Sequence, residues 1–144
     1  MREYVVTCCS TADMSRTFME TNEVPFAMFH YQLDGKEYAD DLYSSISPEV
    51  FYKMIGDGAQ PVTSQVNVEA YCALFEPVLK SGKDVLHLTL SSGISGSINS
   101  ANVAKTQMEE KYPDRRVMVV DSLAASSGYG MLVEQTLENQ RAGM

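Results

Sequence analysis

Short β-forming runs alternate along the chain with longer stretches in which apolar residues recur at helical spacing. Because parallel neighbouring strands need crossover connections, this alternation predicts an α/β fold with a mostly parallel sheet and helices on both faces. Strands are predicted at residues 4–7, 24–33, 84–90 and 116–120. Helices are predicted up to residue 22, from 48 to 56, from 68 to about 81, from the turn at 91–97 to about 112, and from about 126 to 141.

Turn and cap residues set several of these boundaries. Asp34-Gly35 is a strong hairpin signal, so the second strand is expected to double back there. Ser47 and Asn67 are typical N-caps of the second and third helices. Pro77 lacks the N–H that a straight helix needs, so we expect a kink or an early end at this residue.

A turn rich in serine and glycine joins the strand ending near Leu90 to the next helix. Glycines allow a tight turn and close approach to a ligand, and the free N–H groups at a helix start favour an anionic oxygen. Serine hydroxyls add neutral donors. A serine-rich N-cap with flexible glycines is the alternative interpretation. The candidate binding residues are Ser91, Ser92, Gly93, Ser95 and Gly96.

Hydroxyl or acidic residues also follow the other predicted strands. Ligands of open α/β sheets bind beyond the carboxyl ends of the strands, so these groups are expected to gather at one edge as a binding cleft. Thr63 and Ser64 belong to a second hydroxyl-rich turn that precedes the third helix. The supporting candidates are Ser10, Thr11, Asp121 and Ser122.

Composition narrows the classes of function. The 144 residues, 44% of them hydrophobic, suit one globular domain. Eleven basic and nineteen acidic residues leave a net charge of −8 without a basic cluster, so nucleic acid is not an expected partner. We find no membrane span and no signal-peptide pattern, which predicts a cytoplasmic protein.

Cysteine and histidine spacing predicts no metal site, and no cofactor is expected. In a reducing compartment Cys8 and Cys9 are expected to be buried, unlinked thiols without a redox role.

Two other activities find little support in the motifs. The phosphate-binding patterns GxxxxGK[ST] and GxGxxG are absent, so nucleotide binding has no motif behind it. The hydrolase pattern GxSxG nearly occurs at residues 93–97, but Ser97 replaces its last glycine. An acyl-ester hydrolase using Ser95 is kept as the alternative function. Its general base would be His30 or His87, and both lie in strand-like runs where a structural role is the simpler interpretation.

The ordered set of these motifs resembles the DegV family. The matching segments are 5–7 with 10–13, Val24-Pro25, Tyr38-x-Asp40, 63–65, 91–97 with 100–101, and 120–122. The resemblance implies a non-enzymatic protein of the bacterial cytoplasm that binds a long-chain fatty acid. Some members of the family present the bound acyl carboxylate to a separate acyl kinase. Carried over from the family, the hydroxyls that hold this carboxylate are those of Thr63, Ser64, Ser91, Ser92 and Ser95.

Two features depart from the family pattern. The first strand of members usually ends in Thr-Asp, where this chain has Cys8 and Cys9. Members also carry a second lobe that closes over the ligand. We therefore expect residues 1–144 to be a DegV-like N-terminal α/β domain with the second lobe absent.

An acyl chain needs an apolar channel, and methionine side chains adapt to such a lining. The chain has nine methionines. Most of them, including Met54, Met108 and Met118, are expected in the core, and Met28 is the candidate for the channel.

Overall fold

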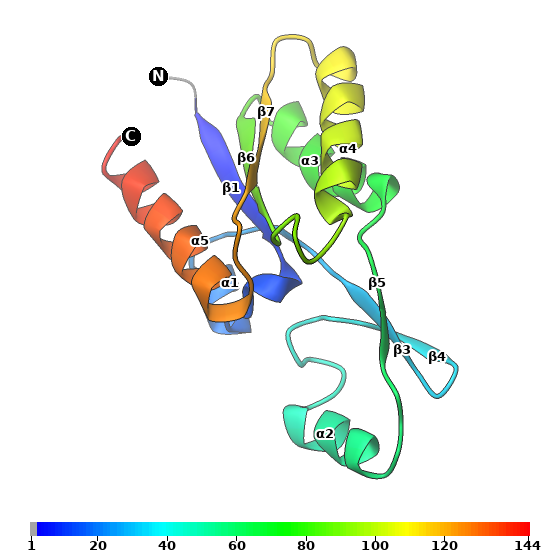
Figure 1. The fold of residues 1–144 in the computed structure, drawn as a ribbon. Helices are drawn as coiled ribbons and strands as arrows, with labels where there is room; N and C mark the ends of the chain where they lie inside the picture. Colours follow the sequence, from blue (N-terminus) through cyan, green and yellow to red (C-terminus); the bar gives the residue numbers. More distant parts are fainter. Residues whose placement is uncertain (1–2) are drawn as a thin grey trace.

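The computed structural model describes residues 3–144, and a parallel sheet forms its centre (Figure 1). Its four strands lie in the order β2-β1-β6-β7, with every neighbouring pair parallel. The strands are β1 (Tyr4–Cys9), β2 (Phe26–Ala27), β6 (Asp84–Thr89) and β7 (Val117–Asp121). The predicted mostly parallel sheet is confirmed.

Helices cover both faces of this sheet, as the alternating pattern predicted. On one face α3 (Val68–Lys80) packs beside α4 (Ser97–Lys111), and on the other lies α5 (Ser126–Arg141) with α1 (Arg16–Thr21) close to it (Figure 1). A single 3-10 turn, η1 (Ser10–Ala12), connects β1 towards α1 and packs against α5.

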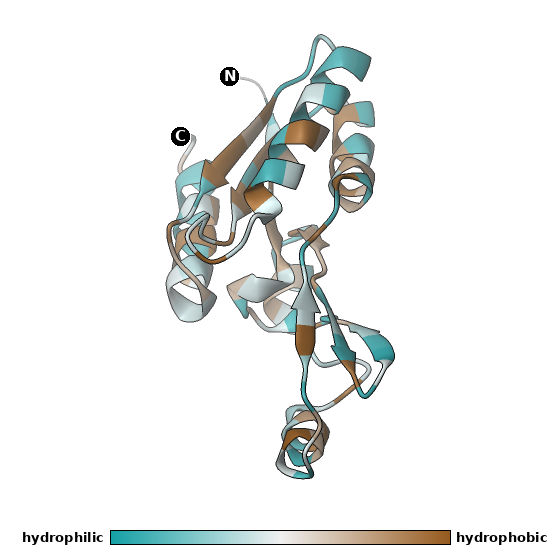
Figure 2. Cartoon of the chain, turned by 45° about the vertical axis from the view of Figure 1, so that its right-hand side comes forward, coloured by the Kyte–Doolittle hydropathy of each residue, from teal (hydrophilic) through white to brown (hydrophobic). Residues whose placement is uncertain are grey.

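A second, antiparallel sheet projects from this body (Figures 1 and 2). It has the order β4-β3-β5, and α2 (Pro48–Gly56) lies at its far end. Its strands are β3 (His30–Leu33), β4 (Lys36–Ala39) and β5 (Val62–Ser64). The prediction of one strand over 24–33 was therefore wrong, because β2 pairs with β1 in the main sheet and β3 then enters the second sheet.

The local turn and cap signals are confirmed. Asp34 and Gly35 both adopt positive φ, at 51° and 76°, in the two-residue turn between β3 and β4. The Ser47 hydroxyl accepts a hydrogen bond from the N–H of Val50, and the Asn67 side chain accepts one from that of Ala70.

One of the two alternatives predicted at Pro77, the early end, and the predicted turn at Thr63-Ser64 were wrong. Helix α3 does not end early at Pro77 but continues to Lys80, since the buried Val78 and Leu79 hold its last turn against the core. Thr63 and Ser64 do not form a turn, because residues 62–64 pair with β3 as strand β5.

The core lies between the parallel strands and their helices, and in Figure 2 hydrophobic segments follow these strands. Cys8 and Cys9 are buried there as free thiols, as predicted. Met108 is buried and Met54 is half-buried, but Met118 is 59% exposed, contrary to prediction. Met118 lies on β7, which is an edge strand of the main sheet and has one side unpaired.

Candidate hydroxyl-lined binding site

Residues 91–97, which we call the serine turn, follow the carboxyl end of β6 and are held together by hydrogen bonds within the turn. The N–H groups of Ile94 and Ser95 both donate to the carbonyl of Ser91, at 3.0 and 3.1 Å. The buried Ser91 hydroxyl accepts from the N–H of Gly93 at 3.2 Å. Ser91 is thus occupied in shaping the turn, whereas Ser92 and Gly93 are exposed at its tip.

Gly96 brings the serine turn close to the segment that follows β5. A Cβ atom added at this glycine would lie 2.9 Å from Nε2 and 3.0 Å from Oε1 of Gln65, closer than real Cβ contacts allow. The backbone φ of Gly96 is −78°, so its small size rather than a left-handed conformation explains the glycine. The sequence had suggested conformational freedom, and it did not single out Gln65 as a neighbour.

The end of β7 supports the serine turn from the other side. The Asp121 carboxylate accepts hydrogen bonds from the N–H groups of Ser92 at 3.1 Å and Leu123 at 3.0 Å. Hydrogen bonding by the Ser92 side chain, followed by the backbone bond from Leu123, lowers the pKa of Asp121 below its ordinary value. The Ser122 hydroxyl bonds locally to the backbone of Ala124. Asp121 therefore positions the turn, whereas Ser122 shapes the loop that follows β7.

A direct hydrogen bond ties the segment after β5 to the start of α4. The N–H of Val66 donates to the hydroxyl of Ser97 at 3.3 Å, and both residues are buried. Thr63 and Ser64 come just before Val66 in the sequence, and both are exposed. The Ser64 hydroxyl donates to the carbonyl of His30 at 3.4 Å. We call the region where residues 63–66 meet the serine turn the junction.

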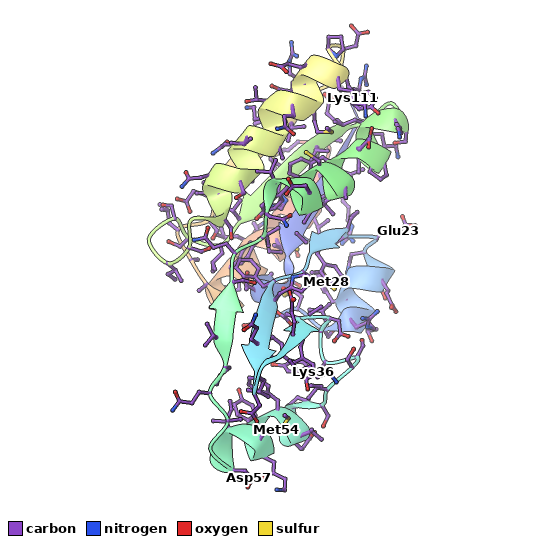
Figure 3. All side chains as sticks on the ribbon, turned by 90° about the vertical axis from the view of Figure 1, so that its right-hand side faces the viewer. Glu23, Met28, Lys36, Met54, Asp57 and Lys111 are labelled. Atoms are coloured by element: carbon purple, nitrogen blue, oxygen red, sulfur yellow. The ribbon has the colours of Figure 1, made fainter. Side chains whose placement is uncertain are left out.

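A cavity of about 280 Å³ opens beside Thr63, between η1 and the second sheet. Two predicted site residues, Thr11 and Thr63, line the cavity, but no residue of the serine turn does. Met28, the predicted channel residue, does not line it and is 39% exposed, near the start of the second sheet in Figure 3. The lining residues are Thr11, Asp13, Phe29, His30, Tyr31, Ala39, Asp40, Asp41, Tyr43, Ile46, Phe51, Pro61 and Thr63.

The first two residues of η1 differ in whether their side-chain hydroxyls have hydrogen-bond partners. The Ser10 hydroxyl accepts from the N–H of Phe29 at 3.1 Å and also bonds to Asp40. Burial raises the pKa of Asp40 above its ordinary value, and this hydrogen bond opposes the rise. In contrast, the Thr11 hydroxyl oxygen is buried and has no hydrogen-bond partner within residues 3–144. Thr11 therefore carries a buried, unpaired hydroxyl beside the cavity.

The arrangement does not support the hydrolase alternative. The Ser95 hydroxyl bonds to the hydroxyl of Ser97 and accepts from its N–H, at 2.9 and 3.2 Å. His87 is fully buried and bonds to Thr7 instead, and burial lowers its pKa to about 3. His30 lies in the cavity lining, on β3. Within the described residues, neither histidine forms a pair with Ser95.

Two features that the described residues lack bear on the site. Residues 3–144 contain no cluster of three or more His, Cys, Asp or Glu side chains able to hold a metal ion. Within the same range, none of the helices has the length and apolar character required to cross a bilayer.

A parallel α/β sheet with a serine-rich turn at the carboxyl end of its strands defines the chain as an α/β domain with a candidate small-ligand site at the sheet edge. Residues 5–143 match the model of the DegV family of uncharacterised proteins. The chain therefore belongs to the DegV family, as its motifs had suggested.

Relatives in sequence and structure support this assignment. A DegV domain-containing protein of Clostridium perfringens is 33% identical over 143 residues, covering 99% of this chain and 49% of the relative. A DegV family protein from Thermus thermophilus, whose structure is described as showing fatty acid binding, has a TM-score of 0.87 at 30% identity, covering 100% of this chain and 49% of that one.

A stearic-acid-binding protein from Eubacterium ventriosum has a TM-score of 0.89 at 29% identity, covering 98% of this chain and 48% of that one. The chain thus spans about half the length of the curated relatives it matches.

Proposed function

We propose that this chain is a fatty-acid-binding domain that holds an acyl carboxylate at the junction. The observation that carries the proposal is the meeting of two hydroxyl-bearing segments, residues 63–66 and the serine turn, at the start of α4. Hydroxyls and backbone N–H groups stabilise an anion by hydrogen bonding, most strongly when the acceptor is charged. The relatives from Thermus thermophilus and Eubacterium ventriosum support a fatty acid as the ligand.

The cavity beside Thr63 is suited to part of the acyl chain rather than to the carboxylate. Phe29, Tyr31 and Phe51 supply apolar surface there. Asp13, Asp40 and Asp41 also line the cavity, and their charges would repel a carboxylate placed among them. The head group is therefore placed on the serine-turn side of Thr63 and the chain on the cavity side.

The proposal includes the organisation that the family resemblance implies. Residues 1–144 act as the N-terminal lobe of a two-lobed, non-enzymatic cytoplasmic protein, and no cofactor takes part. The extent of the match, about half of each relative's length, supports this division.

A partner acyl kinase would receive the head group at the serine turn. Ser92 and Gly93 are exposed at the tip of the turn, and the neighbouring Ile94 is 66% exposed. An apolar side chain beside a polar ligand site is a suitable contact for a second protein.

Native mass spectrometry of the natural full-length protein, purified from cells, tests the proposal directly. We expect a mass increase that matches a bound long-chain fatty acid. Replacing Thr63 or Ser92 by alanine should weaken fatty-acid binding by about 1.5 to 3 kcal/mol, the range for hydrogen bonds to charged groups. Unchanged affinity in both variants, with native circular dichroism, would show that the head group binds elsewhere.

A further inference from the structure

The face of the main sheet that carries α5 becomes progressively more exposed from β1 to β7. Val6, Leu86 and Met118 lie in one row across this face, because Val6 pairs with Leu86 and Leu86 pairs with Met118. Val6 is 2% exposed, Leu86 is half-buried and Met118 is 59% exposed. In the next row Leu88 is 5% exposed, and its partner Val120 on β7 is 39% exposed. Within residues 3–144, the β7 side of this face is therefore uncovered.

The opposite face of the sheet is covered as far as β7. His87 on β6 points to this face, where the centroid of its ring lies 5.1 Å from that of Tyr71 on α3. Val117 on β7 is fully buried, and α4 packs on this strand. Because side chains alternate along a strand, Met118 and Val120 point to the face away from α3 and α4. The exposure of these two residues thus belongs to one face of β7 and not to the whole strand.

Helix α5 covers the β1 side of the exposed face. It packs against η1 and β1, away from the outer edge of β7 (Figure 1). Parallel sheets are normally buried on both faces, because the crossover connections place helices on each of them. Met118 and Val120 are also large apolar side chains, so burying them would stabilise the fold. A further covering element is therefore expected beside α5.

The C-terminal residues lie on the same face, at the end of the sheet where the parallel strands begin. Helix α5 ends at Arg141, and the carbonyl of Met144 accepts a hydrogen bond from the hydroxyl of Tyr4 at 2.9 Å. Tyr4 is the first residue of β1, and Figure 1 shows the C-terminus near this end of the strand. Since β7 is two strands away from β1, its start is about 10 Å from there. Chain that followed Met144 would begin beside the uncovered rows.

We propose that the part of the natural chain that follows residue 144 packs apolar side chains on Leu86, Met118 and Val120 and completes the cover of the sheet. This inference rests on the two-lobed organisation in the proposed function. The relatives support an occupant from the same chain, because residues 1–144 span about half of their length. A second copy fits less well, since a stable dimer buries about 20 to 30 residues a side. The net charge of −8 on each copy also opposes self-association.

Thiol labelling of the natural full-length protein tests this cover. Met118→Cys is treated with a maleimide, and labelling of the peptide that contains the new cysteine is followed by mass spectrometry and divided by its rate in urea. Val103→Cys is the matched control, because Val103 is 48% exposed on α4, on the opposite side of the sheet. Met118→Cys should react at least about tenfold more slowly than Val103→Cys, since the reagent must wait for local opening. Val120→Cys is the second test variant and should be protected in the same way.

The outcomes separate this inference from the proposed function. Equal normalised rates at residues 118, 120 and 103 would overturn the cover. Protection that is lost on dilution would overturn it as well, because it would show that a second copy is the occupant. Native mass spectrometry of the same samples reports the bound fatty acid independently. Protection without a bound fatty acid contradicts the proposed ligand and supports the cover, whereas a bound fatty acid with equal rates does the reverse.

Discussion

Gly96 and Gln65 are in such close contact that a single added methyl group at residue 96 would lie 2.9 Å from the Gln65 amide nitrogen. This contact joins the serine turn to the segment after β5, and the proposed head-group site depends on it. A substitution at Gly96 therefore probes the site separately from the core.

We expect Gly96→Ala to weaken carboxylate binding while lowering the unfolding free energy by less than about 1 kcal/mol. The neighbour it displaces is the far end of a flexible side chain, which can move at small cost. Titration with hexanoate and urea unfolding would measure the two effects. Gly56→Ala, where the new Cβ meets no atom within 4 Å, is the control. An unchanged hexanoate affinity in Gly96→Ala would show that Gln65 is not part of the site.

Helix α5 should be sensitive at one glycine and tolerant at another. A Cβ atom at Gly130 would lie 2.7 Å from the backbone oxygen of Ala12 and 2.6 Å from the sulfur of Met14, so Gly130→Ala should destabilise the fold by about 1 to 3 kcal/mol. At Gly128 the nearest atom is 3.5 Å away, and Gly128→Ala should stabilise the helix by up to about 1 kcal/mol. Chemical unfolding of both variants tests this pair, and equal effects would contradict the tight packing of α5 on η1.

His87 should make the folded state sensitive to mild acid. Burial lowers its pKa to about 3, whereas the imidazole of the unfolded chain titrates near its ordinary value of about 6.5. Because the unfolded state binds the proton first, the contribution of neutral His87 is complete above about pH 6.5 and declines as the pH falls towards 3. At pH 5.5 the loss should be about 1.4 kcal/mol.

Urea unfolding at pH 7.5 and 5.5 measures this loss, and His87→Gln provides the comparison. The variant is expected to be less stable at pH 7.5 and to lose less stability between the two pH values. An equal loss in both proteins would show that other groups cause the acid sensitivity.

The exposed side chain of Ile94 should matter for transfer of the head group to a kinase and not for binding of the lipid. Ile94→Ser removes the apolar surface of a residue that is 66% exposed and adds no charge beside the carboxylate, so the fold and the fatty-acid affinity should remain close to wild type. Formation of acyl phosphate by an acyl kinase from the same organism should fall at least about tenfold if a desolvated apolar contact is lost. Undiminished acyl phosphate formation would place the kinase contact elsewhere.

Much of the fold could be predicted from the sequence because its determinants are local. The spacing of apolar residues specified the helices that begin at Val68 and Ser126, and Ser47 and Asn67 marked helix starts through their own side-chain hydrogen bonds. Alternation of strands and helices was sufficient to predict the parallel sheet, since parallel neighbours require such connections. The ordered motifs also identified the family correctly.

Tertiary structure decided what the local pattern left open. Segment 24–33 reads as one β-forming run, yet its first part pairs with β1 and its last part with β4 and β5, because pairing depends on partners far away in the sequence. For the same reason Thr63 and Ser64 became strand residues, and Met118 became exposed at a sheet edge.

The sequence by itself therefore determined the elements, their order and the hydroxyl-rich segments, since these depend on neighbouring residues. Only the folded chain brought Gln65 against Gly96 and the N–H of Val66 to the hydroxyl of Ser97. Both contacts link residues that are 31 positions apart, and they form only when the packing of α3, α4 and β5 fixes the distance between them.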